Sequence, residues 1–357
     1  MTGPPHNRVH REARRPDHVP ALVVQERDLR VLRAIFENRF LTRDLLLDLF
    51  PPDVNRTPRK AIEAARAKRS VESTGRPPNP QPGTNLDRRL ARFFQNGFLD
   101  RFRATAAGEF AYALTWKGVE LLQTEDVDFP IPPLRDASER KQRKGAWDEN
   151  NRQAGTSFLD HTLAVARFRI ALAKAIADAP GVAVQRFERE HPSLSAAWSV
   201  SGRSLPEICR RNHKRPNEIA IYPDAFFIME EPAGVASAFF LEMDRGTAQL
   251  GRVLEKLIHY ERLYIDRQHQ PHFGIDSFKV LVVAPRPGRA SNLLGTVADD
   301  DSPIHERHRS LFLFTAEDAY LKHPTNVLAA IWRSPDQPEE RRGLIGSPLP
   351  RRGAKPE

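Results

Sequence analysis

The sequence predicts an α/β protein with two folded domains: an N-terminal domain of helices and one β-hairpin, and a C-terminal domain built on a mixed sheet. Three observations support this fold class. Proline-rich or charged stretches divide the 357 residues, apolar residues recur at helical spacing in the first half, and short strand patterns alternate with helices in the second. The length allows about two domains, and a hydrophobic content of 40% is enough for both cores.

Four stretches lack the pattern of packed elements and set the predicted domain boundaries. Proline fixes φ and removes a backbone donor, so the run RPPNPQPGT fits no regular element. The four stretches are a disordered basic tail at 1–20, a proline-rich loop at 76–84 that closes an insert at 51–83, a linker at 129–155 and a disordered tail at 334–357. The folded domains are therefore expected at 21–128 and 156–333.

The first domain is predicted to begin with two short helices. Apolar residues at helical spacing, from Leu29 to Phe36, predict the first helix, and Thr42 is placed to cap the second, LTRDLLLDLF. A basic helical stretch, TPRKAIEAARAKRS, lies within the insert. Two interpretations of the insert stay open: an additional phosphate-binding helix, or a sign that the helices pair differently.

A third helix, a hairpin and a closing helix complete this domain. The third helix, TNLDRRLARFFQ, has Thr84 as its expected N-cap and Gly97 just beyond its end. Two strand-like segments, FLDRFR and FAYALT, lead into a helix capped by Thr115. Three helices, a hairpin and a helix follow one another in the winged helix-turn-helix fold, so we predict this fold for residues 21–128.

The third helix carries the prediction that this domain binds double-stranded DNA. One helix face is apolar, whereas the other presents Arg and Gln side chains at helical spacing; in the major groove Arg prefers guanine and Gln prefers adenine. Two further arginines alternate along the hairpin, where they can reach phosphates or the minor groove. The predicted contacts are Arg88, Arg89, Arg92, Gln95, Arg101 and Arg103. The alternative is that these arginines form only a solvated surface.

The second domain is predicted to combine helices with a mixed sheet. A long helix opens it, three strands follow, and a helix and a buried strand come next before a last α/β pair. The expected segments are 157–177, 182–190, 221–229, 237–244, 248–267, 278–284, 307–316 and 319–323. Strands surrounded by helices imply a sheet covered on both faces.

Three carboxylates gather at the ends of two predicted strands. Glu242 and Asp244 are two residues apart, so they should project from the same face of a strand. Asp224 begins the preceding strand and can lie beside them if the two strands are antiparallel. Oxygen ligands of this kind suit Mg²⁺ or Mn²⁺, which can activate water and stabilise charge on a phosphodiester.

This arrangement resembles the PD-(D/E)XK nuclease superfamily, whose core has the order α-β-β-β-α-β. Pro223, Asp224 and Glu242 match its motif, but Asp244 stands where the superfamily has lysine. The resemblance implies that Asp224, Glu242 and Asp244 would hold the metal in an active endonuclease. Lys256 on the following helix, or Glu188 on an earlier strand, would then assist the attacking water; Glu190 is an alternative to Glu188, and Tyr260 lies one turn beyond Lys256.

A narrower resemblance joins both domains. The winged helix together with HTLAVARFRIAL, YPDAFFIM, FFLEMDRGT and KLIHYERLY is similar to the replication-relaxation family. That resemblance implies a bacterial mobile-element or plasmid protein that works with replication or mobilisation proteins. Two functions follow from it: a magnesium-dependent nicking enzyme delivered by the winged helix, or a non-catalytic regulator or accessory factor with a degenerate nuclease fold.

Simpler interpretations of the second domain stay open. An Asp after Pro is common in turns, and Asp244 can cap the helix that follows it. Tyr260 and Tyr264 are reminiscent of relaxase nucleophiles, but the sequence offers no histidine triad to accompany them. Zinc-ligand spacing, a P-loop and a G-x-S-x-G elbow are likewise missing from the sequence.

Composition limits the environment and the partners. A formal net charge of +9 makes polyanions plausible partners. Cys209 has no second cysteine to pair with, which fits a cytoplasmic protein. No run approaches about 18 uninterrupted apolar residues, so no membrane span is expected. Winged helices often form homodimers, and no long heptad repeat indicates one here.

Overall fold

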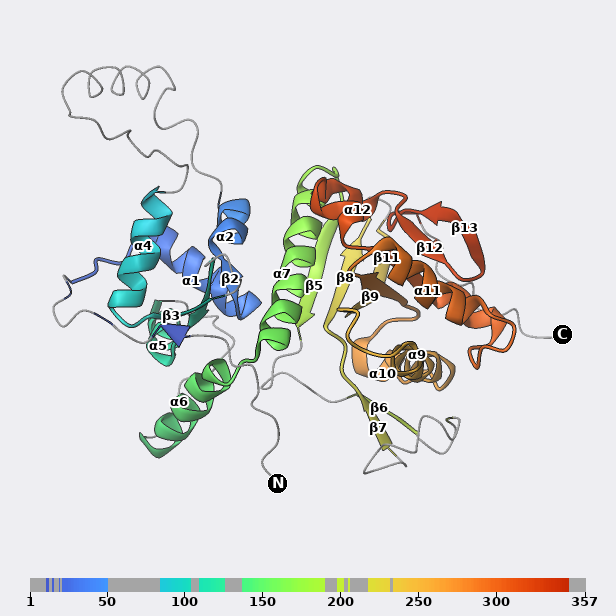
Figure 1. Ribbon diagram of the computed structural model, residues 1–357, viewed down its shortest axis with the longest axis horizontal. Helices are drawn as coiled ribbons and strands as arrows, with labels where there is room; N and C mark the ends of the chain where they lie inside the picture. The colour runs from blue at the N-terminus through green and yellow to red at the C-terminus, as the bar shows by residue number, and fades with distance from the viewer. Residues whose placement is uncertain are drawn as a thin grey trace, which may run out of the picture. The chain divides into compact units, whose positions relative to one another are not determined.

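The computed structural model describes residues 11–12, 15, 19, 21–50, 84–103, 109–125, 137–189, 198–201, 205, 218–231 and 234–346. The chain divides into two compact units, Met1–Ala166 and Arg167–Glu357 (Figure 1). The division falls inside helix α7 (Thr156–Ala177), so one helix is shared by both units. The basic helix expected at 57–70 lies outside the described residues.

The first unit combines short helices with a small antiparallel sheet. Its helices are α1 (Glu26–Asn38), α2 (Arg43–Leu49), α4 (Thr84–Gln95), α5 (Trp116–Glu125) and α6 (Ala137–Arg152). Its strands are β1 (Arg11–Glu12), β2 (Leu41–Thr42), β3 (Leu99–Arg103) and β4 (Phe110–Leu114). The strands pair in the order β1-β3-β4-β2, and β3 and β4 form the expected hairpin.

Local chemistry fixes three of these helix ends as the sequence predicts, whereas Thr84, the expected N-cap of α4, is already its first residue. The Thr42 hydroxyl accepts the Leu45 N–H at 3.4 Å at the start of α2. Gly97 follows α4 with φ +80°, a conformation that glycine adopts without a Cβ clash. The Thr115 hydroxyl accepts the Gly118 N–H at 3.3 Å at the start of α5. The expected apolar face of α4 is buried, with Leu90 and Phe93 fully inside the core.

The N-terminal segment differs from the expectation of a disordered tail over residues 1–20. Arg11 and Glu12 form β1 against β3. Asp100 on β3 is 1% exposed and forms ion pairs with Arg11 at 2.8 Å and Arg15 at 2.9 Å. A buried carboxylate needs compensating charge, which these two arginines supply. Composition alone suggested a tail because these arginines have no apolar neighbours in the sequence.

The expected linker at 129–155 contains helix α6, which packs on the first unit. The Trp147 ring stacks on Phe36 at a centroid distance of 5.8 Å and meets Trp116 edge-on at 6.4 Å. The Trp147 indole N–H donates to the Leu114 carbonyl at 2.9 Å, and the buried Asn151 amide donates to the same oxygen at 3.1 Å. One large aromatic side chain therefore anchors an otherwise polar helix.

The second unit is a mixed α/β layer structure. Its main strands are β5 (Ala183–Arg189), β8 (Ala225–Glu230), β9 (Ala236–Met243), β10 (Lys279–Ala284), β11 (Phe312–Ala316), β12 (Trp332–Ser334) and β13 (Gln337–Arg342). They form a seven-stranded sheet in the order β13-β12-β11-β10-β9-β8-β5. β9, β10 and β11 are parallel and the other pairs are antiparallel, which confirms the predicted mixed sheet. β6 (Trp198–Ser201) and β7 (Glu218–Ile221) form a separate pair.

Helices cover both faces of this sheet. Phe168 of α7 contacts Phe227 of β8, Trp332 of β12 and Tyr320 on one face. On the other face, α9 (Leu250–Ile265) and α11 (Pro287–Ala298) join a buried cluster with apolar side chains of β8 to β11, including Phe240. Figure 1 shows the same layering, with α7 and the α9–α11 pair on opposite sides of the sheet. Short helices α10 (His269–Phe273), α12 (Asp318–Leu321), η2 (Glu306–Leu311) and η3 (Pro324–Leu328) complete the unit.

Two segments of this unit differ from the sequence expectation. Helix α11 was given no residues of its own in the prediction, although it follows β10 directly. The expected disordered tail from residue 334 instead begins with the β12–β13 hairpin, and Leu344 beyond it is fully buried. β13 is an edge strand of sequence QPEERR with mostly exposed side chains. An edge strand of this kind lacks the apolar alternation from which strands are recognised.

Candidate functional site

Helix α4 has a buried apolar face and an exposed basic face. Arg88 and Arg92 lie one turn apart and are both exposed, while Gln95 is half-buried. A cavity of about 600 Å³ lies between the start of α1 and α4, and its lining includes Gln25 and Arg27 as well as these three side chains. The basic face of α4 and the beginning of α1 therefore line the same cavity.

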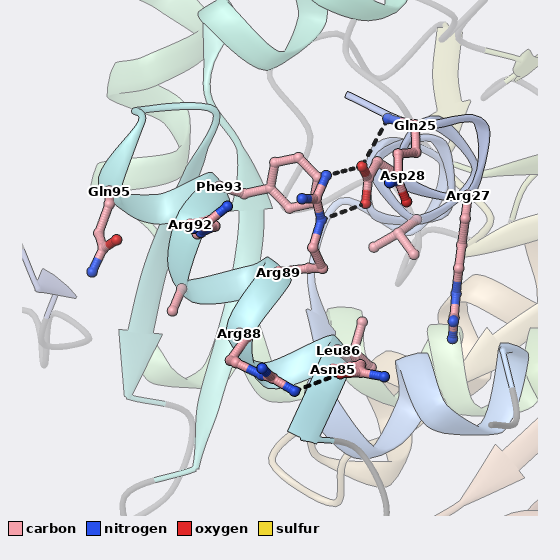
Figure 2. A pocket seen from close by; sticks show the side chains of 12 residues that line it. Gln25, Arg27, Asp28, Asn85, Leu86, Arg88, Arg89, Arg92, Phe93 and Gln95 are labelled. Atoms are coloured by element: carbon pink, nitrogen blue, oxygen red, sulfur yellow. Dashed lines mark hydrogen bonds and ion pairs between the residues drawn. The ribbon is translucent and has the colours of Figure 1, made fainter. Parts of the chain in front are cut away.

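Arg89, which was also predicted to contact DNA, is turned inward. Its Nε donates to Asp28 Oδ1 at 2.9 Å, a second guanidinium nitrogen pairs with Asp28 Oδ2, and the group also donates to the Val23 carbonyl at 3.0 Å. Asp28 is 3% exposed, whereas 25% of the Arg89 side chain is exposed, so the carboxylate is the buried partner of the pair. Figure 2 shows Arg89 reaching from α4 to Asp28, whereas Gln95 points away from α1. Arg89 therefore positions α4 against α1.

The remaining arginines of the predicted surface differ in how they are held. Arg88 donates to Asn85 Oδ1 at 2.7 Å in an exposed contact, which a ligand can replace at little cost (Figure 2). Arg101 lies over the rings of Phe94 and Phe110, at 4.2 and 4.7 Å from the centroids, and is half-buried. Arg103, at the end of β3, is exposed. Arg88, Arg92 and Arg103 are thus the most accessible members of the set.

Sequence reasoning missed Arg27. It lies in the first turn of α1, is exposed, and lines the same cavity as Arg88 and Arg92. In Figure 2 its side chain extends away from the Asp28–Arg89 pair. The signal available in the sequence was its position next to Asp28 at the start of the first helix, but only the fold brings that position beside α4.

In the second unit, Glu242 lies on the face of β9 that α9 covers. Lys256 and Tyr260 are one turn apart on α9, and they contact the two oxygens of the Glu242 carboxylate: the ammonium pairs with Oε2 and the phenol donates to Oε1. The pKa of Glu242 is raised from 4.5 to about 7: burial is the largest cause and the charge of Asp224 adds to it, while Lys256 and Tyr260 oppose the increase. Lys256 thus reaches Glu242.

Asp224 and Asp244 lie at strand ends near Glu242 and are held by other donors. Asp224 Oδ2 accepts the Met243 N–H at 2.6 Å. Asp244 is 9% exposed and receives both Arg289 guanidinium bonds, at 2.7 and 3.3 Å. Asp244 and Glu242 both contact helices on the α9–α11 face, in agreement with their predicted shared orientation. The fifth predicted residue, Glu188, is held at 2.6 Å by Arg186 of its own strand, β5.

These carboxylates do not fit a divalent metal as they are arranged. Magnesium requires several oxygen ligands in near-octahedral geometry. Here both oxygens of Glu242 and both oxygens of Asp244 already accept bonds from protein cations or a phenol. Within the described ranges, no group of three or more His, Cys, Asp or Glu side chains is placed to hold a metal ion.

A known protein family matches much of this chain. No helix among the described residues is long and apolar enough to cross a membrane. No curated protein and no solved structure matches the chain. Residues 32–277 match the family described as replication-relaxation, a span that covers more than half of the chain and includes both α4 and the Glu242 cluster. The chain therefore belongs to the replication-relaxation family, as its motifs predict.

Proposed function

We propose that this protein binds double-stranded DNA through α4 and serves the replication or mobilisation of a mobile element such as a plasmid. The family supports the setting, and the first unit supports the mode of binding. The described elements run α1, β2, α2, α4, the β3–β4 hairpin and α5, the order of a winged helix-turn-helix domain, in which the third helix enters the major groove.

The exposed basic face of α4 is the observation that carries this proposal. Arg88 and Arg92 are accessible, one turn apart, and face a cavity that Arg27 of α1 also lines. Arginine pairs with guanine edges and phosphates. The inward-facing Asp28–Arg89 pair holds this face in a fixed orientation, which reduces the entropy lost when DNA binds.

The test is a salt titration of DNA binding. We expect Arg88→Gln combined with Arg92→Gln to weaken binding to duplex DNA at least about tenfold, because each bidentate arginine contact is worth roughly 1–3 kcal/mol. The slope of log K against log salt should also fall by up to about 1.8, or about 0.9 for each phosphate contact that is lost. Fluorescence anisotropy with a labelled duplex gives both quantities.

A matched variant controls for net charge. Arg267→Gln with Arg307→Gln removes the same charge from two exposed positions of the second unit and should leave affinity within about twofold. If the α4 variant binds like wild type, or no more weakly than this control, α4 is not the recognition helix.

Metal-dependent nicking is a second candidate function, and the contact between Lys256 and Glu242 is the observation that favours it. We propose instead that the second unit binds DNA without cutting it, because protein donors already occupy its carboxylate oxygens. Supercoiled plasmid incubated with Mg²⁺ or Mn²⁺ should therefore stay supercoiled. Metal-dependent relaxation by the wild type that Glu242→Gln abolishes would establish the nicking function instead.

A further inference from the structure

The three parallel strands of the second unit end side by side at one edge of the sheet. The Asp244 N–H donates to Val283 of β10 at 2.9 Å, and the Glu317 N–H donates to Ala284 of β10 at 2.9 Å. The loops after β9 and β10 also touch, since a Cβ added at Gly246 would lie 3.4 Å from the Pro285 ring. These strand ends and loops form one continuous edge.

Four arginines lie along this edge. Arg245 follows β9, Arg286 is the N-cap of α11, Arg289 lies in the first turn of α11, and Arg167 comes from α7. Arg286 is exposed, and the side chains of Arg245, Arg289 and Arg167 are 16%, 20% and 31% exposed. We call these four residues the carboxyl-edge arginines.

Two buried carboxylates orient three of the four arginines. Asp244 holds Arg289, which also donates to the Ala248 carbonyl at 2.7 Å. Glu317 is 6% exposed and holds Arg245 at 2.5 Å, with Arg167 at 3.8 Å. Three of the four arginines are therefore paired with these two carboxylates. Asp224, which accepts the Met243 N–H, adds a third carboxylate at the end of β9, and the N-terminus of α11 adds partial positive charge.

The carboxyl-edge arginines are spread along the edge instead of surrounding one point. Asp244 and its partner Arg289 lie on the α9–α11 face, whereas Arg245 and Glu317 meet Arg167 of α7 on the opposite face. A single small anion cannot contact guanidinium groups on both faces. A row of phosphates can, because all four arginines are at least partly exposed along the edge.

We infer that the carboxyl-edge arginines form a second binding surface for the phosphate backbone of nucleic acid, separate from α4. That the bound polyanion is DNA rests on the proposed function. The arrangement of the arginines along the edge is independent of that proposal. The two carboxylates keep the guanidinium groups in place and compete with incoming phosphates for them. Removing a cation should therefore weaken binding, and removing a carboxylate should strengthen it.

Four single variants of the full chain test this inference. Arg286→Gln removes an exposed cation of the edge, and Asp244→Asn releases Arg289. Arg307→Gln and Asp300→Asn make the same charge changes at exposed positions outside the edge. Affinity for a labelled duplex is measured between about 50 and 200 mM salt. We expect Arg286→Gln to weaken binding about fivefold and to lower the salt slope by about 0.9, the contribution of one phosphate contact.

Opposite signs distinguish binding from damage to the fold. Asp244→Asn should tighten binding by a similar factor, while both control variants stay within about twofold of wild type. If Asp244→Asn does not fold, Arg286→Gln, which changes an exposed side chain, decides the matter. The inference is overturned if Arg286→Gln behaves like Arg307→Gln, or if a folded Asp244→Asn variant binds more weakly than wild type.

The test also separates this inference from the proposed role of α4. The same variants are measured in the Arg88→Gln, Arg92→Gln background. If α4 is not the recognition helix, that background binds like wild type while Arg286→Gln still weakens binding. If only the edge inference fails, the α4 variant still weakens DNA binding. Arg286→Gln then lowers affinity no more than its charge control, Arg307→Gln.

Discussion

Replacing Glu242 by glutamine should stabilise the second unit relative to wild type. This gain should be larger at neutral pH than at acidic pH. The Glu242 carboxyl is buried between β9 and α9, and its pKa is raised from 4.5 to about 7. Glutamine resembles the protonated acid, which the fold prefers, and it does not titrate. The glutamine oxygen can still accept from the Lys256 ammonium, while its NH2 can donate to the Tyr260 hydroxyl oxygen.

The magnitude follows from the pKa difference between the folded and unfolded chain. A group whose pKa is raised by folding contributes stability that is complete below the unfolded value and is lost as pH rises through the folded value. For Glu242 this window runs from about pH 4.5 to about 7. At 1.36 kcal/mol per pKa unit, the loss is roughly 3 kcal/mol, equivalent to roughly 6–12 °C in melting temperature for a unit of this size.

The assay is denaturant unfolding of wild type and Glu242→Gln from about pH 4 to pH 8, followed by circular dichroism. Groups that titrate equally in both proteins cancel in the difference, which isolates Glu242. We expect the difference in unfolding free energy to change by roughly 3 kcal/mol in favour of glutamine as pH rises. A difference that stays constant across this range would refute the raised pKa, as would one that favours glutamate at high pH.

Three further substitutions test the packing of the first unit. Gly118→Ala should destabilise it by roughly 1–3 kcal/mol, because the new Cβ would lie 2.5 Å from the Phe98 carbonyl oxygen; calorimetry measures the shift, and an unchanged melting temperature would contradict the close approach. Trp147→Ala should lower the free energy of unfolding by roughly 3–5 kcal/mol and release α6. Hydrogen exchange of the α6 amides measures this release, and retained protection would show that other contacts hold α6. Asp28→Ala should lower the free energy of unfolding by roughly 3–5 kcal/mol, because it leaves Arg89 without its buried partner. In chemical unfolding, the double variant Asp28→Ala, Arg89→Met should recover part of that loss, and no recovery would show that the two residues are not coupled.

Much of the fold was predictable because it depends on local patterns. Helices α1 and α4 carry apolar stripes, and the strands of the large sheet are apolar runs bounded by polar turns. Helix α6 was not predicted, because a single tryptophan anchors a polar stretch and its partners are distant in sequence. The β12–β13 hairpin was missed for a similar reason: its outer strand carries polar side chains on both faces.

The candidate sites show the same division between local and long-range information. Lys256 and Tyr260 are four residues apart, so helical periodicity predicts that they share one face of α9, and in the structure both contact Glu242. Periodicity could not show which arginine of α4 turns inward, because Arg89 is selected by Asp28, 61 residues away. Nor could it show that Asp244 is neutralised by Arg289 of a helix 45 residues further on.

The ion pairs at Asp100 have a practical consequence for work with this protein. Arg11 and Arg15 neutralise a carboxylate that is almost fully buried in the hairpin. A chain shortened to residue 21, the start suggested by composition, would keep Asp100 and lose both of its counter-charges. An unpaired buried charge of this kind typically costs several kcal/mol. Trimming the N-terminus to obtain a minimal version of the first unit would therefore destabilise that unit.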